Sequence, residues 1–166
     1  CKVNDETVSA QGVKRNVWCA SHPKNYEMME QILKEVSELF PFEYIHIGGD
    51  EVNLSSWKKC LKCNNLANEK GLLSGVDLQP YLTQKLEGMC KKFNRKLIGW
   101  DEIMGNGVST DTSIMCWSGL KPGYDAAAKG HPVIMDPGPF TYFDMSQGHN
   151  ERGHSWAGLV TTEKIY

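Results

Sequence analysis

Residues 42–51 read Phe-Glu-Tyr-Ile-His-Ile-Gly-Gly-Asp-Glu, an apolar run followed by two glycines and two adjacent carboxylates. The run from 42 to 47 predicts a strand that is covered on both faces. Side chains alternate between the two faces of a strand, so Asp50 and Glu51 can address one small ligand only beyond its end. Gly48 and Gly49 provide that backbone freedom. Acids delivered from the C-terminal end of a strand are typical of α/β-barrel active sites and indicate an enzyme.

The segments around this run alternate between helix and strand. Amphipathic spacing predicts one helix that starts at Asn25 as its N-cap and ends before Pro41, and another over residues 78–93. Residues 52–77 read as an excursion with a polar helical piece at 65–70, and residues 140–166 as loops. Further strands are expected at 96–100, 113–117 and 132–135, with a small helix at 124–129. Short buried strands between amphipathic helices predict a parallel sheet.

Polar and aromatic side chains follow several of these strands. Trp100, Trp117, Tyr142 and Asp144 come just after strand-like segments, as Asp50 and Glu51 do. This clustering favours the C-terminal face of a barrel over a doubly wound sheet. The sequence has no Gly-x-Gly-x-x-Gly and no P-loop, so nucleotide binding is not expected.

Composition excludes several classes of function. The 166 residues carry 18 basic and 20 acidic side chains, for a formal net charge of −2. Without a dense Lys/Arg cluster we expect no nucleic-acid partner, and no apolar run approaches membrane-spanning length.

The cysteines do not settle the redox compartment. There are six, and Cys60 and Cys63 form a Cys-x-x-Cys pair. A zinc site would need two more ligands, and no second pair is evident, so a local disulfide or plain thiols are favoured. We expect neither a metal nor a cofactor.

Four blocks together resemble one family. His46–Val52 resembles the signature of glycoside hydrolase family 20, the β-N-acetylhexosaminidases. Residues 97–102 resemble the family's next strand and 114–117 the one after, while 141–145 with 155–158 resemble its strand-seven loop. The resemblance implies a partial (β/α)8 TIM barrel, with residues 1–166 forming a fragment of one catalytic domain. It begins before the fourth strand and stops before the eighth, so the first strands and the last strand are absent.

The resemblance also implies a mechanism and three catalytic residues. The substrate's 2-acetamido oxygen would attack the anomeric carbon, an exception to the usual two-carboxylate scheme of retaining glycosidases. Glu51 would protonate the leaving oxygen and later activate water. Asp50 would accept a hydrogen bond from the acetamido N–H, and Tyr142 would donate one to the acetamido oxygen.

Four further residues are expected to bind substrate. Trp100 and Trp117 would wall the pocket for the acetamido methyl group. Asp144 would bond a sugar hydroxyl, and Trp156 would stack on the leaving sugar. The implied ligand is an oligosaccharide or glycoconjugate with a terminal β-linked N-acetylglucosamine or N-acetylgalactosamine.

The resemblance bears on location and assembly as well. Enzymes of this kind degrade glycans in secreted, periplasmic or lysosome-like settings. An incomplete barrel would expose sheet edges, which favours self-association.

Alternatives remain open at this point. Asp101-Glu102 is a rival acidic pair, equally compatible with a site role and with bonding loop backbone. A non-catalytic carbohydrate-binding fragment would keep the aromatic platform alone. A metal-dependent hydrolase using His46, Asp50, Glu51 and Asp101 is disfavoured because no His-x-x-x-His spacing occurs. His46 itself is expected to be a hydrogen-bonded core residue, and Trp18 and Trp57 to be core or at most peripheral.

Overall fold

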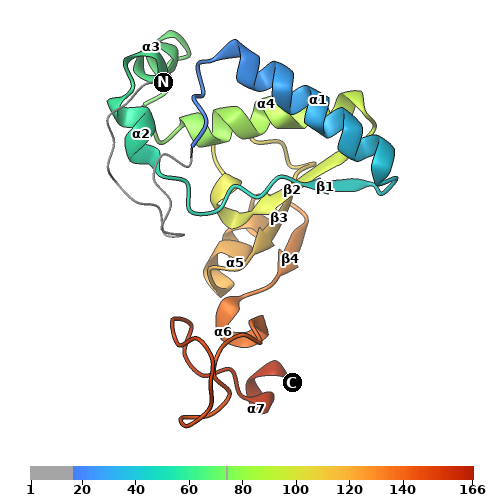
Figure 1. Cartoon of the computed structure of the whole chain (residues 1–166), viewed down its shortest axis with the longest axis vertical. Helices are drawn as coiled ribbons and strands as arrows, with labels where there is room; N and C mark the ends of the chain where they lie inside the picture. Colours follow the sequence, from blue (N-terminus) through green and yellow to red (C-terminus); the bar gives the residue numbers. More distant parts are fainter. Residues whose placement is uncertain (1–16, 74) are drawn as a thin grey trace.

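The computed structural model describes residues 17–73 and 75–166, which are organised around one parallel sheet. Its strands lie in the order β1-β2-β3-β4, and each neighbouring pair is parallel (Figure 1). Their bounds are β1 Tyr44–His46, β2 Lys96–Trp100, β3 Ser113–Cys116 and β4 Val133–Met135. The predicted α/β class with a parallel sheet is confirmed.

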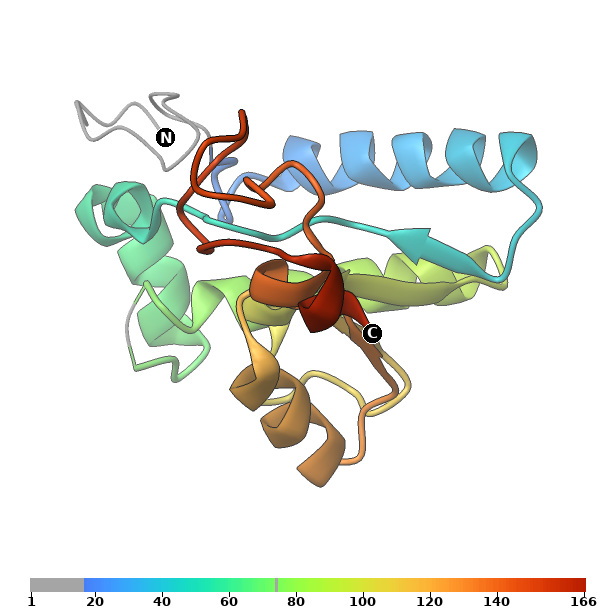
Figure 2. The same ribbon diagram turned by 90° about the horizontal axis from the view of Figure 1, so that it is seen from below.

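Helices connect most of the strands. The longer ones are α1 Pro23–Leu39, α4 Leu78–Lys92 and α5 Leu120–Ala128. The shorter ones are α2 Leu54–Lys59, α3 Leu61–Glu69, the 3-10 helix η1 Asp101–Ile103, α6 Gly138–Thr141 and α7 Thr162–Ile165. Helix α1 packs against α4, α4 against β2, and α5 against both β3 and β4. Figure 2 shows α1 and α4 running alongside each other. Within the residues described, no helix is both long and apolar enough to cross a bilayer.

The strand register brings the C-terminal strand ends to one edge. Ile98 is paired with both His46 and Ser113, and Met135 is paired with Cys116. Parallel strands aligned in this way place the residues that follow them side by side. The turn after β1 therefore lies next to η1, which follows β2 directly.

Two apolar clusters support this arrangement. The larger lies between the sheet and its helices, with Ile114 and Cys116 fully buried at its centre. Burial raises the pKa of the Cys116 and Cys90 thiols to about 11, so both are inert packing groups. The smaller cluster joins the segment before α1 to α2, α3 and the start of α4 around Trp57.

The smaller cluster contains the Cys-x-x-Cys pair. Cys19 and Cys60 are each disulfide-bonded, whereas Cys63 keeps a thiol. Cys60 and Cys63 are therefore not joined to each other, and neither simple reading of the motif holds. The sulfurs of Cys19, Cys60 and Cys63 lie within 4.8 Å of one another. Tertiary contact thus adds a third sulfur that no local spacing in the sequence predicts.

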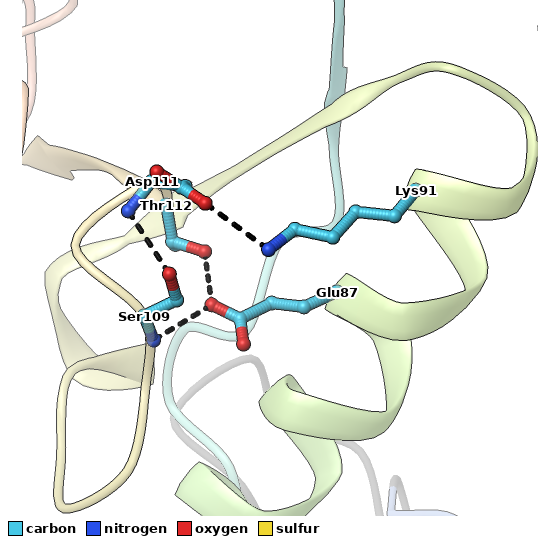
Figure 3. A network of polar contacts seen from close by, with 5 residues as sticks. All are labelled: Glu87, Lys91, Ser109, Asp111 and Thr112. Carbon is cyan, nitrogen blue, oxygen red and sulfur yellow. Dashed lines mark hydrogen bonds and ion pairs between the residues drawn. The ribbon is translucent and has the colours of Figure 1, made fainter.

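A buried carboxylate fixes the loop between β2 and β3 to helix α4 (Figure 3). Glu87 accepts hydrogen bonds from the Ser109 N–H, at 3.0 Å, and from the Thr112 hydroxyl. One turn along α4, Lys91 pairs with the exposed Asp111 at 3.1 Å. The connection between β2 and β3 contains the short 3-10 helix η1 but no α-helix. Polar contacts with α4 therefore fix its position.

Helix α1 and strand β1 differ from the prediction at their ends. Helix α1 begins at Pro23, and Asn25 is not its N-cap, because proline is favoured at the first helical position and His22 precedes it. The Asn25 side chain instead donates to the Cys19 carbonyl. Strand β1 is shorter than 42–47 and buries only Ile45, so the prediction of a strand covered on both faces is wrong; β1 lies at one edge of the sheet.

Candidate active site

The C-terminal edge of the sheet carries a cavity of about 540 Å³. Its lining combines two acids with four aromatic side chains: Asp50, Glu51, Trp100, Trp117, Tyr142 and Trp156. They come from the ends of β1, β2 and β3 and from the segment that follows β4. The structure thus brings together six of the seven residues that the sequence predicts for the site.

The turn that carries the two acids has an unusual backbone. Gly48, Gly49 and Glu51 have φ angles of 71°, 96° and 49°, in the left-handed region. A side chain on Gly49 would also collide with Ile103, whose Cγ2 lies 2.2 Å from the Cβ position. Glycine is therefore required at 49 by both conformation and space. The Glu51 backbone keeps this sparsely populated conformation because its neighbours hold it there.

Three hydrogen bonds tie this turn to other elements of the fold. The Trp100 N–H donates to the Gly48 carbonyl at 3.0 Å, and the Gln79 side chain donates to the Gly49 carbonyl at 2.6 Å. The Glu51 N–H donates to Glu102 Oε1 at 3.3 Å. Contacts from β2, α4 and η1 therefore determine where the two acids sit.

Three aromatic rings form one wall of the cavity. Trp117 and Tyr142 are stacked, with centroids 6.5 Å apart and planes 19° apart. Trp156 meets both rings edge-on, at 5.5 Å from Tyr142 and 6.0 Å from Trp117. Aromatic faces of this kind suit the apolar C–H face of a sugar ring or an acyl methyl group.

The Tyr142 hydroxyl is kept protonated. Partial burial is the main cause of its raised pKa, and the nearby carboxylates of Asp136, Asp144, Asp50 and Asp101 add to it. A phenol in such surroundings is a hydrogen-bond donor across the neutral range.

His46 lies at the margin of the site and not in the core, so that prediction is wrong. Its ring is exposed, it meets Trp100 at 4.7 Å, and its Nδ1 accepts the Gly48 N–H at 3.0 Å. Partial burial lowers the pKa of His46, and Asp50 opposes this. The ring supports the turn by accepting a hydrogen bond in its neutral form.

Asp144 is the predicted site residue that does not line the cavity. Its side chain is exposed, and its backbone carbonyl accepts the His154 N–H at 2.8 Å. Contact with a sugar hydroxyl stays a prediction for this residue.

Two functional positions were missed or left open by the sequence. Gln79 gave no signal, since it is one polar residue within a helix. Glu102 was ambiguous; the structure places its Oε2 3.0 Å from Trp117 Nε1, while Asp101 accepts from the Ser118 N–H and hydroxyl at 3.2 and 2.7 Å. Glu102 thus bonds a residue that lines the cavity, and Asp101 bonds the residue that follows it in the chain.

The metal alternative finds no support in the geometry. Within the described part of the chain, one group of three or more potential metal-ligating side chains lies close together, and it consists of Cys19, Cys60 and Cys63. His46, Asp50, Glu51 and Asp101 do not converge as a ligand set there.

Comparisons with known proteins agree on one family. The sequence matches the catalytic domain of glycosyl hydrolase family 20 over residues 2–166. It is 36% identical over 161 residues to a β-hexosaminidase of Vibrio furnissii, covering 95% of this chain and 26% of that protein. A β-hexosaminidase of Porphyromonas gingivalis is 38% identical over 138 residues, covering 82% and 18%.

A solved structure adds agreement in three dimensions. The family 20 exo-β-N-acetylglucosaminidase of Vibrio harveyi in complex with N-acetylglucosamine matches with a TM-score of 0.86 and 34% identity, over 95% of this chain and 25% of that one. The chain therefore spans about a quarter or less of the length of these relatives, and its sheet is a part of a (β/α)8 barrel. Since the match takes in nearly every residue, the chain belongs to glycosyl hydrolase family 20.

Proposed function

We propose that the protein carrying this chain removes terminal, non-reducing β-linked N-acetylhexosamine from glycans, with retention of configuration. The observation that carries the proposal is one cavity lined by two adjacent acids, a tyrosine and three tryptophans. Membership of the family and the similarity to β-hexosaminidases support it.

Substrate assistance explains why the two acids are neighbours in sequence. Adjacent residues on one turn are poorly placed to flank a glycosidic bond from opposite faces, as ordinary retaining enzymes require. In the proposed reaction the substrate's acetamido oxygen displaces the leaving group. Glu51 protonates the leaving oxygen and then takes a proton from the incoming water, while Asp50 accepts the acetamido N–H.

The remaining lining residues bind the acetamido group and the sugars. Tyr142 donates a hydrogen bond to the acetamido oxygen, in keeping with its raised pKa. Trp100 and Trp117 enclose the acetamido methyl group, and Trp156 stacks on the leaving sugar. Positioning the internal nucleophile in this way is worth several kcal/mol, on the order of what effective molarities allow.

The proposal also concerns the place of the chain in the catalytic barrel and the location of the whole protein. We assign the chain to strands four to seven of the catalytic barrel, with β1 as the fourth, and expect other parts of the protein to complete the sugar site. A secreted, periplasmic or lysosome-like location fits a glycan substrate.

The test uses the full-length natural protein and two chromogenic substrates. We expect cleavage of 4-nitrophenyl N-acetyl-β-glucosaminide, little action on the matching 2-hydroxy glucoside, and no loss of rate with chelator. Asp50→Asn and Glu51→Gln should each lower kcat/KM by about 100-fold or more. Asp111→Asn, an exposed acid far from the cavity, serves as the control.

Two results would contradict the proposal. Equal cleavage of the 2-hydroxy glucoside would remove the role of the acetamido group. Near-normal turnover by both acid variants would remove the assigned roles of Asp50 and Glu51.

A further inference from the structure

We propose that Glu102 is a positioning residue that holds the general acid Glu51 and the pocket wall Trp117 in one fixed arrangement. The inference rests on the proposed function, because it concerns proton transfer by Glu51. Glu102 follows β2, whereas Glu51 follows β1 and Trp117 follows β3. One side chain on the middle strand end thus reaches the two strand ends beside it.

The two oxygens of Glu102 have different partners. Oε1 accepts the backbone N–H of Glu51 at 3.3 Å, and Oε2 accepts the indole N–H of Trp117 at 3.0 Å. A carboxylate accepts at both oxygens, whereas a neutral amide has one acceptor oxygen and an NH₂ group that only donates. Glutamine can therefore satisfy one of these two donors and must oppose the other.

The bond to Glu51 matters because of that residue's backbone. A non-glycine residue at a φ of 49° persists only where surrounding contacts over-determine it. Fixing the Glu51 N–H fixes the direction in which its side chain leaves the backbone. A general acid must lie within hydrogen-bond reach of the oxygen that it protonates, so a small shift of this turn costs rate.

The cost of keeping Glu102 in place supports a specific role. Burial and, to a smaller extent, the neighbouring Asp101 carboxyl raise the pKa of Glu102, and the N–H groups of Trp117 and Glu51 oppose this by favouring the ionised form. A carboxylate kept ionisable in a desolvated place is more than a solvated loop acid.

Glu102 acts through its neighbours and does not touch substrate in the main cavity. It is not part of the 540 Å³ lining; it lines an adjacent groove of about 500 Å³, and Glu51 lines both. Glu102 therefore lies outside the main cavity, beside the general acid and in contact with the indole N–H of Trp117.

The experiment measures how the rate depends on the leaving group. Aryl N-acetyl-β-glucosaminides, from dinitrophenyl to unsubstituted phenyl, need progressively more help from a general acid. In the full-length protein, Glu102→Gln should lower kcat/KM for the phenyl substrate by roughly 10- to 100-fold and for the dinitrophenyl substrate much less. Glu102→Asp keeps the charge but is one methylene short, so we expect an intermediate dependence.

Glu87→Gln provides the matched control. Glu87 is also a buried acid that accepts one backbone N–H and one side-chain donor, but it lies on α4 away from the cavity. We expect this variant to lose stability without any change in leaving-group dependence. The comparison separates positioning of the acid from general destabilisation.

The outcomes distinguish this inference from the proposed function. If the parent protein cleaves none of the substrates, the proposed function fails. If the parent is active but Glu102→Gln loses the same factor on every substrate, or loses nothing, the positioning role is overturned. An Asp variant indistinguishable from the parent would overturn it as well.

Discussion

At the residue scale, Tyr142 illustrates how surroundings keep one hydroxyl protonated for the role proposed for it. Its pKa lies above the ordinary value of 10.0, because burial and nearby carboxylates disfavour the phenolate. A raised pKa keeps the donor proton in place as pH rises through the neutral and mildly alkaline range. Tyr142→Phe should lower kcat about 10²-fold or more, as loss of one oxyanion donor does.

The pH profile of that variant is the informative measurement. We expect any fall in kcat/KM between pH 7 and about 9 to persist in Tyr142→Phe, since Tyr142 does not titrate there. An alkaline limb that disappears on removing the hydroxyl would assign the limb to Tyr142 and contradict the direction of its pKa.

A second prediction at the residue scale concerns how Glu102 makes folding stability depend on pH. Its pKa is raised above 4.5 in the folded chain, mainly by burial. Ionisation therefore costs more in the folded than in the unfolded state, and stability is lost as pH rises from about 4.5 through the folded pKa. Glu102→Gln should remove this dependence. Melting temperatures of both proteins, taken from pH 4 to 7, test it; parallel curves would contradict it.

At the scale of elements, the turn after β1 depends on glycine for two separable reasons. Gly49→Ala meets Ile103 at 2.2 Å and also keeps a positive φ, whereas Gly71→Ala has a φ of 66° with nothing within 4 Å. Gly71→Ala isolates the conformational cost. We expect Gly49→Ala to lower the free energy of unfolding by about 1–3 kcal/mol more, the typical cost of overpacking. Urea unfolding measures the difference, and equal losses would show that Ile103 moves away freely.

The loop between β2 and β3 depends on the acid in Figure 3. Glu87→Ala leaves the Ser109 N–H and the buried Thr112 hydroxyl without their acceptor, which should cost about 1–3 kcal/mol. Asp111→Ala removes an exposed ion pair with Lys91 and an exposed hydrogen bond with Ser109, so little measurable change is expected. Thermal unfolding of both variants tests the ranking, and a larger loss for Asp111→Ala would reverse it.

Elements with their own strong pattern were predictable. The periodicity over 78–93 and the apolar run at 96–100 correspond closely to α4 and β2, because each has an internal signal. Helix α5 starts four residues before its predicted start at 124, and α2 and part of α3 were not expected. Helices α2 and α3 are held by the cluster around Trp57, which forms by tertiary contact and leaves no periodic pattern in the sequence.

The same division applies to the candidate site. Asp50 and Glu51 were predictable because a strand, two glycines and two acids are consecutive. The contacts of Glu102 and Gln79 were not, because they depend on the register of β2 against β1 and on the placement of α4.

At the scale of the whole molecule, the sheet ends in β1 and β4, and within residues 17–73 and 75–166 each of these strands has a neighbour on one side only. Apolar side chains on them are exposed, including Tyr44 at 42% and Ile134 at 47%. Open edges with apolar side chains pair with other chains, so the 166-residue chain alone should self-associate as its concentration rises. Sedimentation velocity measures this.

A charged edge should oppose that association. Ile134→Lys on β4 is expected to shift the chain toward monomer, whereas Tyr166→Lys, which changes an exposed aromatic outside the sheet, should not. Equal effects of both variants would indicate nonspecific hydrophobic association and not pairing of strand edges.

The aromatic wall has an optical consequence. Three of the five tryptophans in the chain line the cavity, and Trp156 among them is 57% exposed. A sugar seated against those indoles displaces solvent from them, so intrinsic fluorescence should change in wavelength or intensity on saturation. Trp57, sealed in the second cluster at 3% exposure, supplies a constant background. Occupancy can therefore be titrated without any label, even in variants that no longer turn over.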